Sequence, residues 1–207
     1  MGIENFIAFL VATVLFVLTP GIETVFLINK SISQGRRTGV YTSFGLNTGA
    51  LVHTLFGALG LSIMVAKSAV FFALIKYLGA AYLIYLGATK VMSKKGLITG
   101  MNEELKKDSA KSNFTSGFVT NILNPKVALF FIAFFPQFIS PTEIENPVPF
   151  MILGVIYAIM TTVWYLVLTS FAGTFSTKIK ENEKMGVRLN KISGVIFVLM
   201  GLQIAFM

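Results

Sequence analysis

The stretch that decides the fold is LTPGIE, residues 18–23, which lies inside an apolar run from Phe6 to Ile28. It places a proline, a glycine and an acid where an unbroken apolar helix would otherwise continue. The other eight of the nine acidic residues lie in polar connections or near the N-terminus. A charged acid is costly in lipid hydrocarbon, and proteins that keep one generally use it in an ion or substrate pathway. The stretch therefore predicts a broken transmembrane helix with Glu23 as a functional residue.

The composition is that of an integral membrane protein. The chain is 55% hydrophobic and only 13% charged, with a mean hydropathy of +0.77. Six apolar segments are each long enough to cross a hydrocarbon core about 30 Å thick. They are residues 5–29, 40–66, 69–92, 114–139, 148–173 and 190–207. We therefore predict an all-α membrane protein that forms one transmembrane domain over residues 1–207, with a solvated linker at residues 93–113.

The net charge of +8 would suit nucleic-acid binding in a soluble protein, so the positions of the cations decide its meaning. Fourteen of the 17 lysines and arginines lie in or beside the first, third and fifth connections between the segments. The positive-inside rule then predicts that these three connections are cytoplasmic and that both termini are outside. The charge predicts membrane topology, and we expect no nucleic-acid partner.

A second break occurs at Asn124-Pro125-Lys126, inside the fourth apolar segment. Six spans divide into two halves of three, and an odd number per half makes the second half inverted relative to the first. We therefore predict two inverted repeats, residues 1–92 and 114–207, with helices 1 and 4 broken at Pro20 and Pro125. Paired broken helices are the best sequence pointer to a transport site. The alternative is coincidence, because proline and glycine recur in many membrane bundles.

The two breaks are expected at the same depth. Pro20 lies ten residues before Lys30, and Pro125 lies eleven residues after Phe114, so each is roughly 15 Å from the inner face. Thr19 and Asn124 are favourable N-cap residues, and the proline after each suits the first position of a new helix. Two half-helices that begin at mid-membrane, at Pro20-Gly21 and at Pro125, would present free N–H groups to an anion such as a carboxylate.

Glu23 and Lys126 are the charged candidates at the breaks. Glu23 could carry a proton or bind the ammonium group of a substrate. Lys126 could be the counter-ion of Glu23 or a contact for a substrate carboxylate. The alternative for both is a permanent structural ion pair, which would satisfy each charge without any role in transport.

Polar residues near the breaks complete the candidate site. His53 is the single histidine and suits a proton relay, or a hydrogen bond between helices. Asn47, Asn121 and Asn124 could line a polar cavity, although hydrogen bonds between helices are their commoner use. Glycines such as Gly45 and Gly49 most often indicate close helix packing. A metal site is not expected, because the chain has no cysteine and no second histidine.

Five motifs together resemble the LysE/RhtB family of amino-acid exporters, and they follow the order found in that family. They are LTPG at 18–21, SQGRRTG at 33–39, KYLGAAYLIYLG at 76–87, NILNPK at 121–126 and FPQF at 135–138. The first motif of the family often continues Gly-Pro-Asn or Gly-x-Asp, whereas this chain reads Gly21-Ile22-Glu23. The resemblance extends over nearly the whole chain.

The resemblance implies a secondary transporter of the bacterial inner membrane that exports amino acids and is driven by the proton gradient, with no cofactor. We expect neutral amino acids or homoserine-like metabolites as substrates. A passive channel is the alternative, although selectivity filters are generally rings of repeated ligands, whereas the polar groups here differ. An enzyme is not expected, because the chain lacks paired buried acids and any HExxH motif. The small mass of 22.6 kDa suggests a homodimer.

Overall fold

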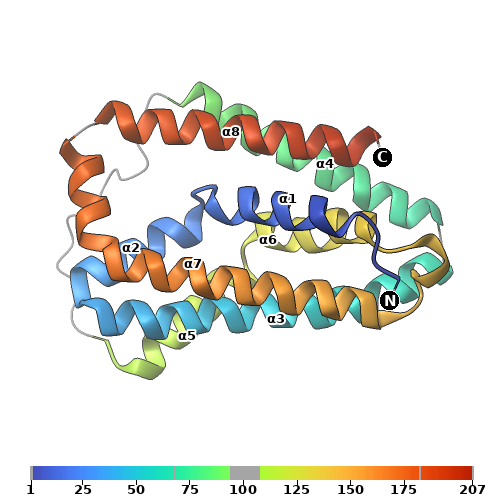
Figure 1. The fold of residues 1–207 in the computed structure, drawn as a ribbon, viewed down its shortest axis with the longest axis horizontal. Coiled ribbons are helices and arrows are strands. Elements are labelled where there is room, and N and C mark those ends of the chain that lie inside the picture. The colour runs from blue at the N-terminus through green and yellow to red at the C-terminus, as the bar shows by residue number, and fades with distance from the viewer. Residues whose placement is uncertain (1, 68, 94–107, 182, 207) are drawn as a thin grey trace.

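The structure is a computed structural model that describes residues 2–67, 69–93, 108–181 and 183–206, without the side chains of 61–69, 71 and 175–183. It is an elongated bundle of helices, and its described residues form no named strand, only an isolated bridge between Ile3 and Ile139 (Figure 1). The prediction of an all-α membrane protein is confirmed. Most of the predicted linker, residues 94–107, lies outside the described residues.

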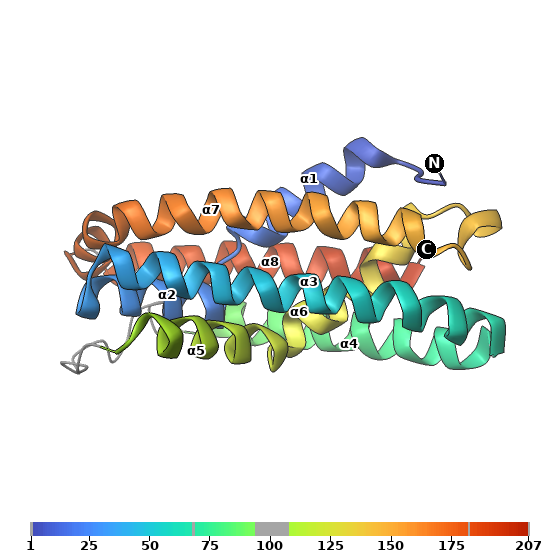
Figure 2. The ribbon, with the colours of Figure 1, turned by 90° about the horizontal axis from the view of Figure 1, so that it is seen from below.

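Four single helices and two bent pairs run along the bundle (Figures 1 and 2). The single helices are α3 (Arg36–Lys67), α4 (Ala69–Met92), α7 (Pro147–Glu181) and α8 (Glu183–Phe206). The first bent pair is α1 (Phe6–Leu18) with α2 (Ile22–Gln34). The second is α5 (Ala110–Ile122) with α6 (Pro125–Leu129), which continues through η1 (Phe130–Phe134) and η2 (Phe135–Phe138); η3 (Pro141–Glu143) precedes α7.

The junctions of the bundle separate into two ends. Both chain termini lie at one end, together with the α3–α4 and η2–α7 connections (Figure 1). The ends of α2, α4 and α7 and the starts of α3, α5 and α8, which flank the three basic connections, lie at the opposite end. We call this second end the basic end. The separation agrees with the charge pattern, and the assignment of the basic end to the cytoplasm stays a prediction.

Single-cysteine labelling tests that topology, because the chain has no native cysteine. Ala110 is exposed and is the first residue of α5, which starts at the basic end; Thr142 is exposed in η3, within the η2–α7 connection at the opposite end. In intact cells an impermeant thiol reagent should therefore label Thr142→Cys and leave Ala110→Cys unlabelled until the membrane is opened. Labelling of Ala110→Cys alone from outside would show that the protein has the reverse orientation.

Length and hydropathy identify five of the six predicted spans, if each bent pair is counted as one span. Three helices, at Phe72–Met92, Pro147–Thr174 and Lys184–Phe206, are long and apolar enough to cross a membrane, and the two bent pairs qualify as two more. α3 covers the second predicted segment but is not in this set, and the side chains of its last seven residues are among those not described. The six-span inverted repeat therefore stays a prediction.

The first break differs in detail from the prediction. Thr19 ends α1, and its hydroxyl donates 2.6 Å to the carbonyl of Leu15 one turn earlier, so it does not cap a new helix. α2 begins only at Ile22, and Gly21 precedes it in an extended conformation. Pro20 is thus in the linker between the two helices, and the prediction of Pro20 as the first residue of the second helix was wrong.

The second break follows the prediction. Asn124 caps α6, and its side-chain oxygen accepts a hydrogen bond of 3.1 Å from the backbone N–H of Lys126. Pro125 occupies the first turn, where its missing N–H costs no hydrogen bond. The two halves of each broken pair meet at the same bend, 51° in both cases. Each break therefore exposes backbone groups inside the bundle.

Small residues allow the helices to approach closely. Gly87 of α4 and Gly194 of α8 face each other, since a Cβ on either would lie 2.5 Å from the carbonyl oxygen of the other. Gly45 and Gly49 of α3 face α5 in the same manner. These contacts agree with the interpretation of the glycines as packing residues.

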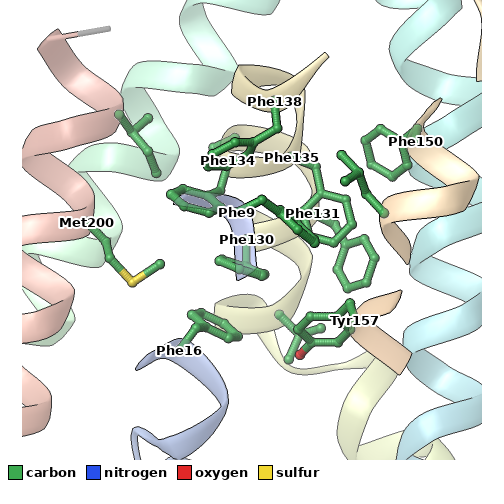
Figure 3. Close-up of a cluster of buried hydrophobic side chains, with 14 of the residues drawn as sticks. Phe9, Phe16, Phe130, Phe131, Phe134, Phe135, Phe138, Phe150, Tyr157 and Met200 are labelled. Atoms are coloured by element: carbon green, nitrogen blue, oxygen red, sulfur yellow. The ribbon is translucent and has the colours of Figure 1, made fainter. Parts of the chain in front are cut away.

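An aromatic cluster fills the bundle on the side of the breaks nearer the termini (Figure 3). Its rings come from α1, η1, η2, α7 and α8, the last through Phe197, and the closest pair is Phe16 stacked on Phe130, with centroids 3.7 Å apart. The members labelled in Figure 3 are Phe9, Phe16, Phe130, Phe131, Phe134, Phe135, Phe138, Phe150 and Tyr157, with Met200 beside them. The cluster fills the core of this half of the bundle with tightly packed rings.

Candidate functional site

Glu23 is held in a buried polar cluster formed by three helices. Its side chain is on the first turn of α2 and is only 6% exposed. One carboxylate oxygen accepts a hydrogen bond of 2.6 Å from the Asn121 amide on α5, and the other accepts one of 2.5 Å from the Tyr165 hydroxyl on α7. Both partners are donors of the kind that a carboxylate accepts. The acid is therefore stabilised without a cation in direct contact.

His53 joins this cluster through the backbone. Its Nε2 lies 3.3 Å from the carbonyl oxygen of Asn121, and its ring stacks on Phe131 at 5.8 Å between centroids. His53 and Glu23 are thus linked through a single residue, Asn121, and do not touch each other by a hydrogen bond in the described structure. This arrangement fits both roles predicted for His53, a proton relay and a hydrogen bond between helices.

Gly49 of α3 makes room for Asn121. A Cβ at this position would lie 2.5 Å from the side-chain oxygen of Asn121 and 2.7 Å from its Cβ. Since no real Cβ approaches so closely, any larger residue would displace the amide that holds Glu23. The glycine is therefore a positioning residue for the carboxylate.

Gly49→Ala should lower transport activity strongly and destabilise the protein by about 1–3 kcal/mol, the usual cost of overpacking. Gly60→Ala is the matched control on the same helix, because nothing lies within 4 Å of the position that its Cβ would occupy. Uptake or export by vesicles, together with thermal unfolding, measures both effects. Equal behaviour of the two variants would contradict the role assigned to Gly49.

Lys126 contacts the end of α1, and we find no ion pair between it and Glu23 in the described structure. Its ammonium donates to the carbonyl oxygens of Thr19 at 3.2 Å and Phe16 at 3.4 Å. It also lies over the rings of Phe16 and Phe197, at 4.2 and 4.9 Å from their centroids. The alternative of a direct Glu23–Lys126 pair is therefore wrong. The lysine bridges the two helix breaks instead.

Lys90 of α4 makes an equivalent contact at the same place. Its ammonium donates to the carbonyl oxygen of Pro20 at 3.0 Å and to the side-chain oxygen of Asn190 on α8 at 3.3 Å. The last carbonyls of a helix have no partner within the helix, and lysine side chains can satisfy them. Two lysines from distant parts of the sequence thus converge on the broken end of α1.

A cavity of about 500 Å³ lies beside these lysines. Its walls come from α2, α4, α8 and the second break. Its lining residues are Gly21, Ile22, Val25, Phe26, Asn29, Tyr82, Leu86, Lys90, Asn124, Lys126, Asn190 and Phe197. The lining runs from the breaks along α2 toward the basic end. Phe197 belongs to both the lining and the aromatic cluster, and the rest of the cluster lies on the other side of the breaks. We call this cavity the chamber, and its described lining includes residues of both breaks.

Glu23 is on another face of α2 from this cavity. Residues 22, 25, 26 and 29 recur at helical spacing and line the chamber, whereas Glu23 faces Asn121 and Tyr165. The acid is therefore close to the chamber without lining it. The two faces of α2 therefore have different chemical surroundings, the chamber on one face and the Glu23 hydrogen bonds on the other.

The remaining predicted residues have clear positions. Asn47 is not part of the Glu23 cluster; it bonds to Thr161 and Thr162 on α7, as an interhelical contact would. Thr19, Pro20, Gly21, Asn124 and Pro125 lie at the two breaks, as predicted. We find no group of three metal-ligating side chains in the described part of the chain.

A salt bridge ties α2 to the start of α5 at the basic end. Lys30 lies 2.6 Å from Asp108, and Gln34 donates to the same carboxylate at 3.0 Å. The hydrogen bond from Lys30, reinforced by Gln34 and by the lysine charge, holds the pKa of Asp108 below its ordinary value. Asp108 therefore stays ionised at neutral pH, and the contact joins the half-helix that carries Glu23 to the residues just before α5.

Sequence reasoning missed Lys90 and Tyr165 as site residues. Lys90 lies at the end of an apolar segment and reads as a topology signal, and Tyr165 reads as one of several aromatic residues in α7. One sequence signal could have identified Lys90: it lies two residues inside the third predicted apolar segment, which ends at residue 92. The contact of Tyr165 with Glu23 spans 142 positions and has no local signature.

Comparison with known proteins gives the family. The sequence model of the LysE type translocators matches residues 14–207. The chain is 32% identical to an uncharacterized membrane protein named YrhP from Bacillus subtilis, over 97% of this chain and 98% of the relative. It is 34% identical to an uncharacterized membrane protein of Vibrio cholerae, over 99% and 98% of the two chains. No solved structure matches.

These findings confirm the resemblance and the prediction of a multi-pass membrane protein. The members of the matched family are transporters, so the chain is a transporter and the prediction that it is not an enzyme is confirmed. The two helix breaks, the buried acid and the chamber are the parts of the molecule that this activity can use. The protein belongs to the LysE type translocator family.

Proposed function

We propose that the protein exports amino acids from the bacterial cytoplasm across the inner membrane by proton antiport, with neutral amino acids or homoserine-like metabolites as the favoured substrates. The observation that carries the proposal is the meeting of two broken helices at a chamber lined by Lys90, Lys126 and Asn124, with the buried acid Glu23 on the other face of α2. Such breaks provide polar backbone at membrane depth, where substrates of secondary transporters bind.

Glu23 is the proposed proton carrier. Of the two roles open to it, binding of a substrate ammonium is less favoured, because the carboxylate faces Asn121 and Tyr165 and does not line the chamber. Loss and gain of a proton would change its hydrogen bonds to α5 and α7, and so would bias the position of the half-helix α2. This supports coupling of the proton to the movement of α2.

A passive channel is the second candidate. It is less favoured because the chamber is asymmetric and the packed aromatic cluster lies between it and the end that holds the termini. Alternating access requires a closed half of this kind in each conformation. Formation of a homodimer stays a prediction based on the small size of the chain.

Export of labelled amino acids from preloaded cells tests the proposal. Cells that produce the protein should lose neutral amino acids faster than cells with an empty vector, and collapse of the proton gradient should remove the difference. Glu145→Gln is the control for Glu23→Gln, because it makes the same change at an exposed acid in the connection before α7. Unchanged efflux for every amino acid tested would reject amino-acid export.

A further inference from the structure

We infer that the chamber binds the carboxylate of the exported solute between Lys90 and Lys126, and that the amine of the solute is not needed for binding. The inference rests on the export function proposed above and names the chemical group that the site recognises. Lys126 lies at the second break and Lys90 on a different helix, yet both ammonium groups reach the broken end of α1 and both residues line the chamber.

Each lysine keeps donor capacity for a ligand. An ammonium group has three N–H donors. In the described structure Lys126 uses two of them on the carbonyls of Phe16 and Thr19, and Lys90 uses two on Pro20 and Asn190. In the described structure no third oxygen accepts from either lysine, so one donor on each can reach an anion in the chamber, and the carbonyl contacts fix the direction of both side chains.

Asn124 supplies an independent sign of a ligand. This residue is 4% exposed and lines the chamber, and its side-chain nitrogen has no hydrogen-bond partner in the part of the chain that the structure describes. A buried donor without an acceptor is costly, so it indicates an acceptor that the protein itself does not provide. An oxygen of a carboxylate between the two lysines would satisfy it.

The shape of the break keeps the lysines accessible. A Cβ on Gly21 would lie 3.3 Å from the ammonium of Lys126, so any side chain there would grow over the cation. Gly21 also precedes the first turn of α2, whose N–H groups favour negative charge. The glycine therefore leaves the cation open next to a helix start that adds to the positive potential.

The chamber has no group that would bind an amine. No acidic residue is among its described lining, and the nearest buried acid, Glu23, is occupied by Asn121 and Tyr165 on another face of α2. A cationic group would meet two lysines without a counter-ion. The site should therefore accept an acid whether or not it carries an amine, and it should reject the amine alone.

Matched ligands test this directly on the purified protein. The first series is leucine, 2-hydroxy-4-methylpentanoate and 3-methylbutylamine, and the second is homoserine, 4-hydroxybutanoate and 3-aminopropan-1-ol. In each series the second compound lacks the amine and the third lacks the carboxylate. The first two compounds of each series carry a carboxylate, and we call them the acids. In at least one series we expect both acids to raise the unfolding temperature by roughly 5–10 °C at a hundredfold excess over their Kd. The amines should cause no rise.

Variants assign the effect to the two lysines. Lys90→Met and Lys126→Met should each remove the rise caused by the acids, and Lys90→Arg should retain it because the charge is kept. Lys76→Met is the matched control, since Lys76 is on the same helix α4 but does not line the chamber. If Lys76→Met removed the rise and Lys90→Met did not, the site would be wrongly placed.

The outcomes separate the site from the transport function. If no acid of either series stabilises the wild-type protein, or if an amine stabilises it as much as its acid does, the carboxylate site is wrong. Acids that bind to a protein without export activity would support the site and reject the proposed function. Export that the amines inhibit as strongly as the acids would support the function and reject the site.

Discussion

Glu23→Gln is expected to lower proton-coupled export by about 100-fold or more, the scale on which a positioned proton-transfer group contributes. Glutamine keeps the size and polarity of the side chain but cannot ionise. Its carbonyl oxygen can still accept one of the two hydrogen bonds that Asn121 and Tyr165 donate to the acid. The variant should therefore insert in the membrane at normal levels, and the loss should be one of transport.

Export measured against pH checks this prediction. Glu23→Asp retains an ionisable group and should keep partial activity with a changed pH dependence. Tyr165→Phe removes one hydrogen bond to the carboxylate and should alter the same pH profile without abolishing export. Wild-type export by Glu23→Gln, with an unchanged pH dependence, would exclude Glu23 as the proton carrier.

Lys126→Met should lower export by about tenfold or more, because it removes the charged hydrogen-bond donor that connects the second break to the end of α1. The loss of its hydrogen bonds to Phe16 and Thr19 leaves buried carbonyls without a partner, at a cost of about 1–3 kcal/mol. Some loss of thermal stability should therefore accompany the loss of activity.

The double variant Glu23→Gln/Lys126→Met distinguishes transport from structure. If the two residues formed only a structural ion pair, removal of both charges would restore folding and export. The structure has no direct contact of this kind, so the double variant should remain as inactive as Glu23→Gln alone. Recovery of export in membranes that hold normal amounts of protein would show that the two charges act only as a pair.

The sequence allowed the helix breaks to be predicted because proline and glycine act locally. Pro125 and the cap residue Asn124 begin α6 as expected. The start of α2 was misplaced by two residues, because the hydroxyl of Thr19 bonds backward to Leu15 and leaves Gly21 to precede the helix. Such a choice between two local hydrogen bonds depends on the surrounding helices and has no clear sequence signal.

The contacts of the site could not be predicted to the same extent. Two charged residues at neighbouring breaks suggested a Glu23–Lys126 pair, but helical rotation directs the acid toward α5 and α7 and the lysine toward α1. Position along the sequence gives depth in a membrane, whereas the direction of a side chain around the helix axis is set by packing. For the same reason Lys90 was expected at the membrane surface, although it reaches Pro20.

Proton flux in liposomes tests the central claim most directly. Purified protein is reconstituted with a pH-sensitive dye inside, and a neutral amino acid is added on one side without any imposed ion gradient. We predict proton movement opposite to the amino acid, saturable with its concentration and absent in Glu23→Gln. Amino-acid flux without proton movement, or a large ohmic conductance that Glu23→Gln leaves unchanged, would contradict proton-coupled export.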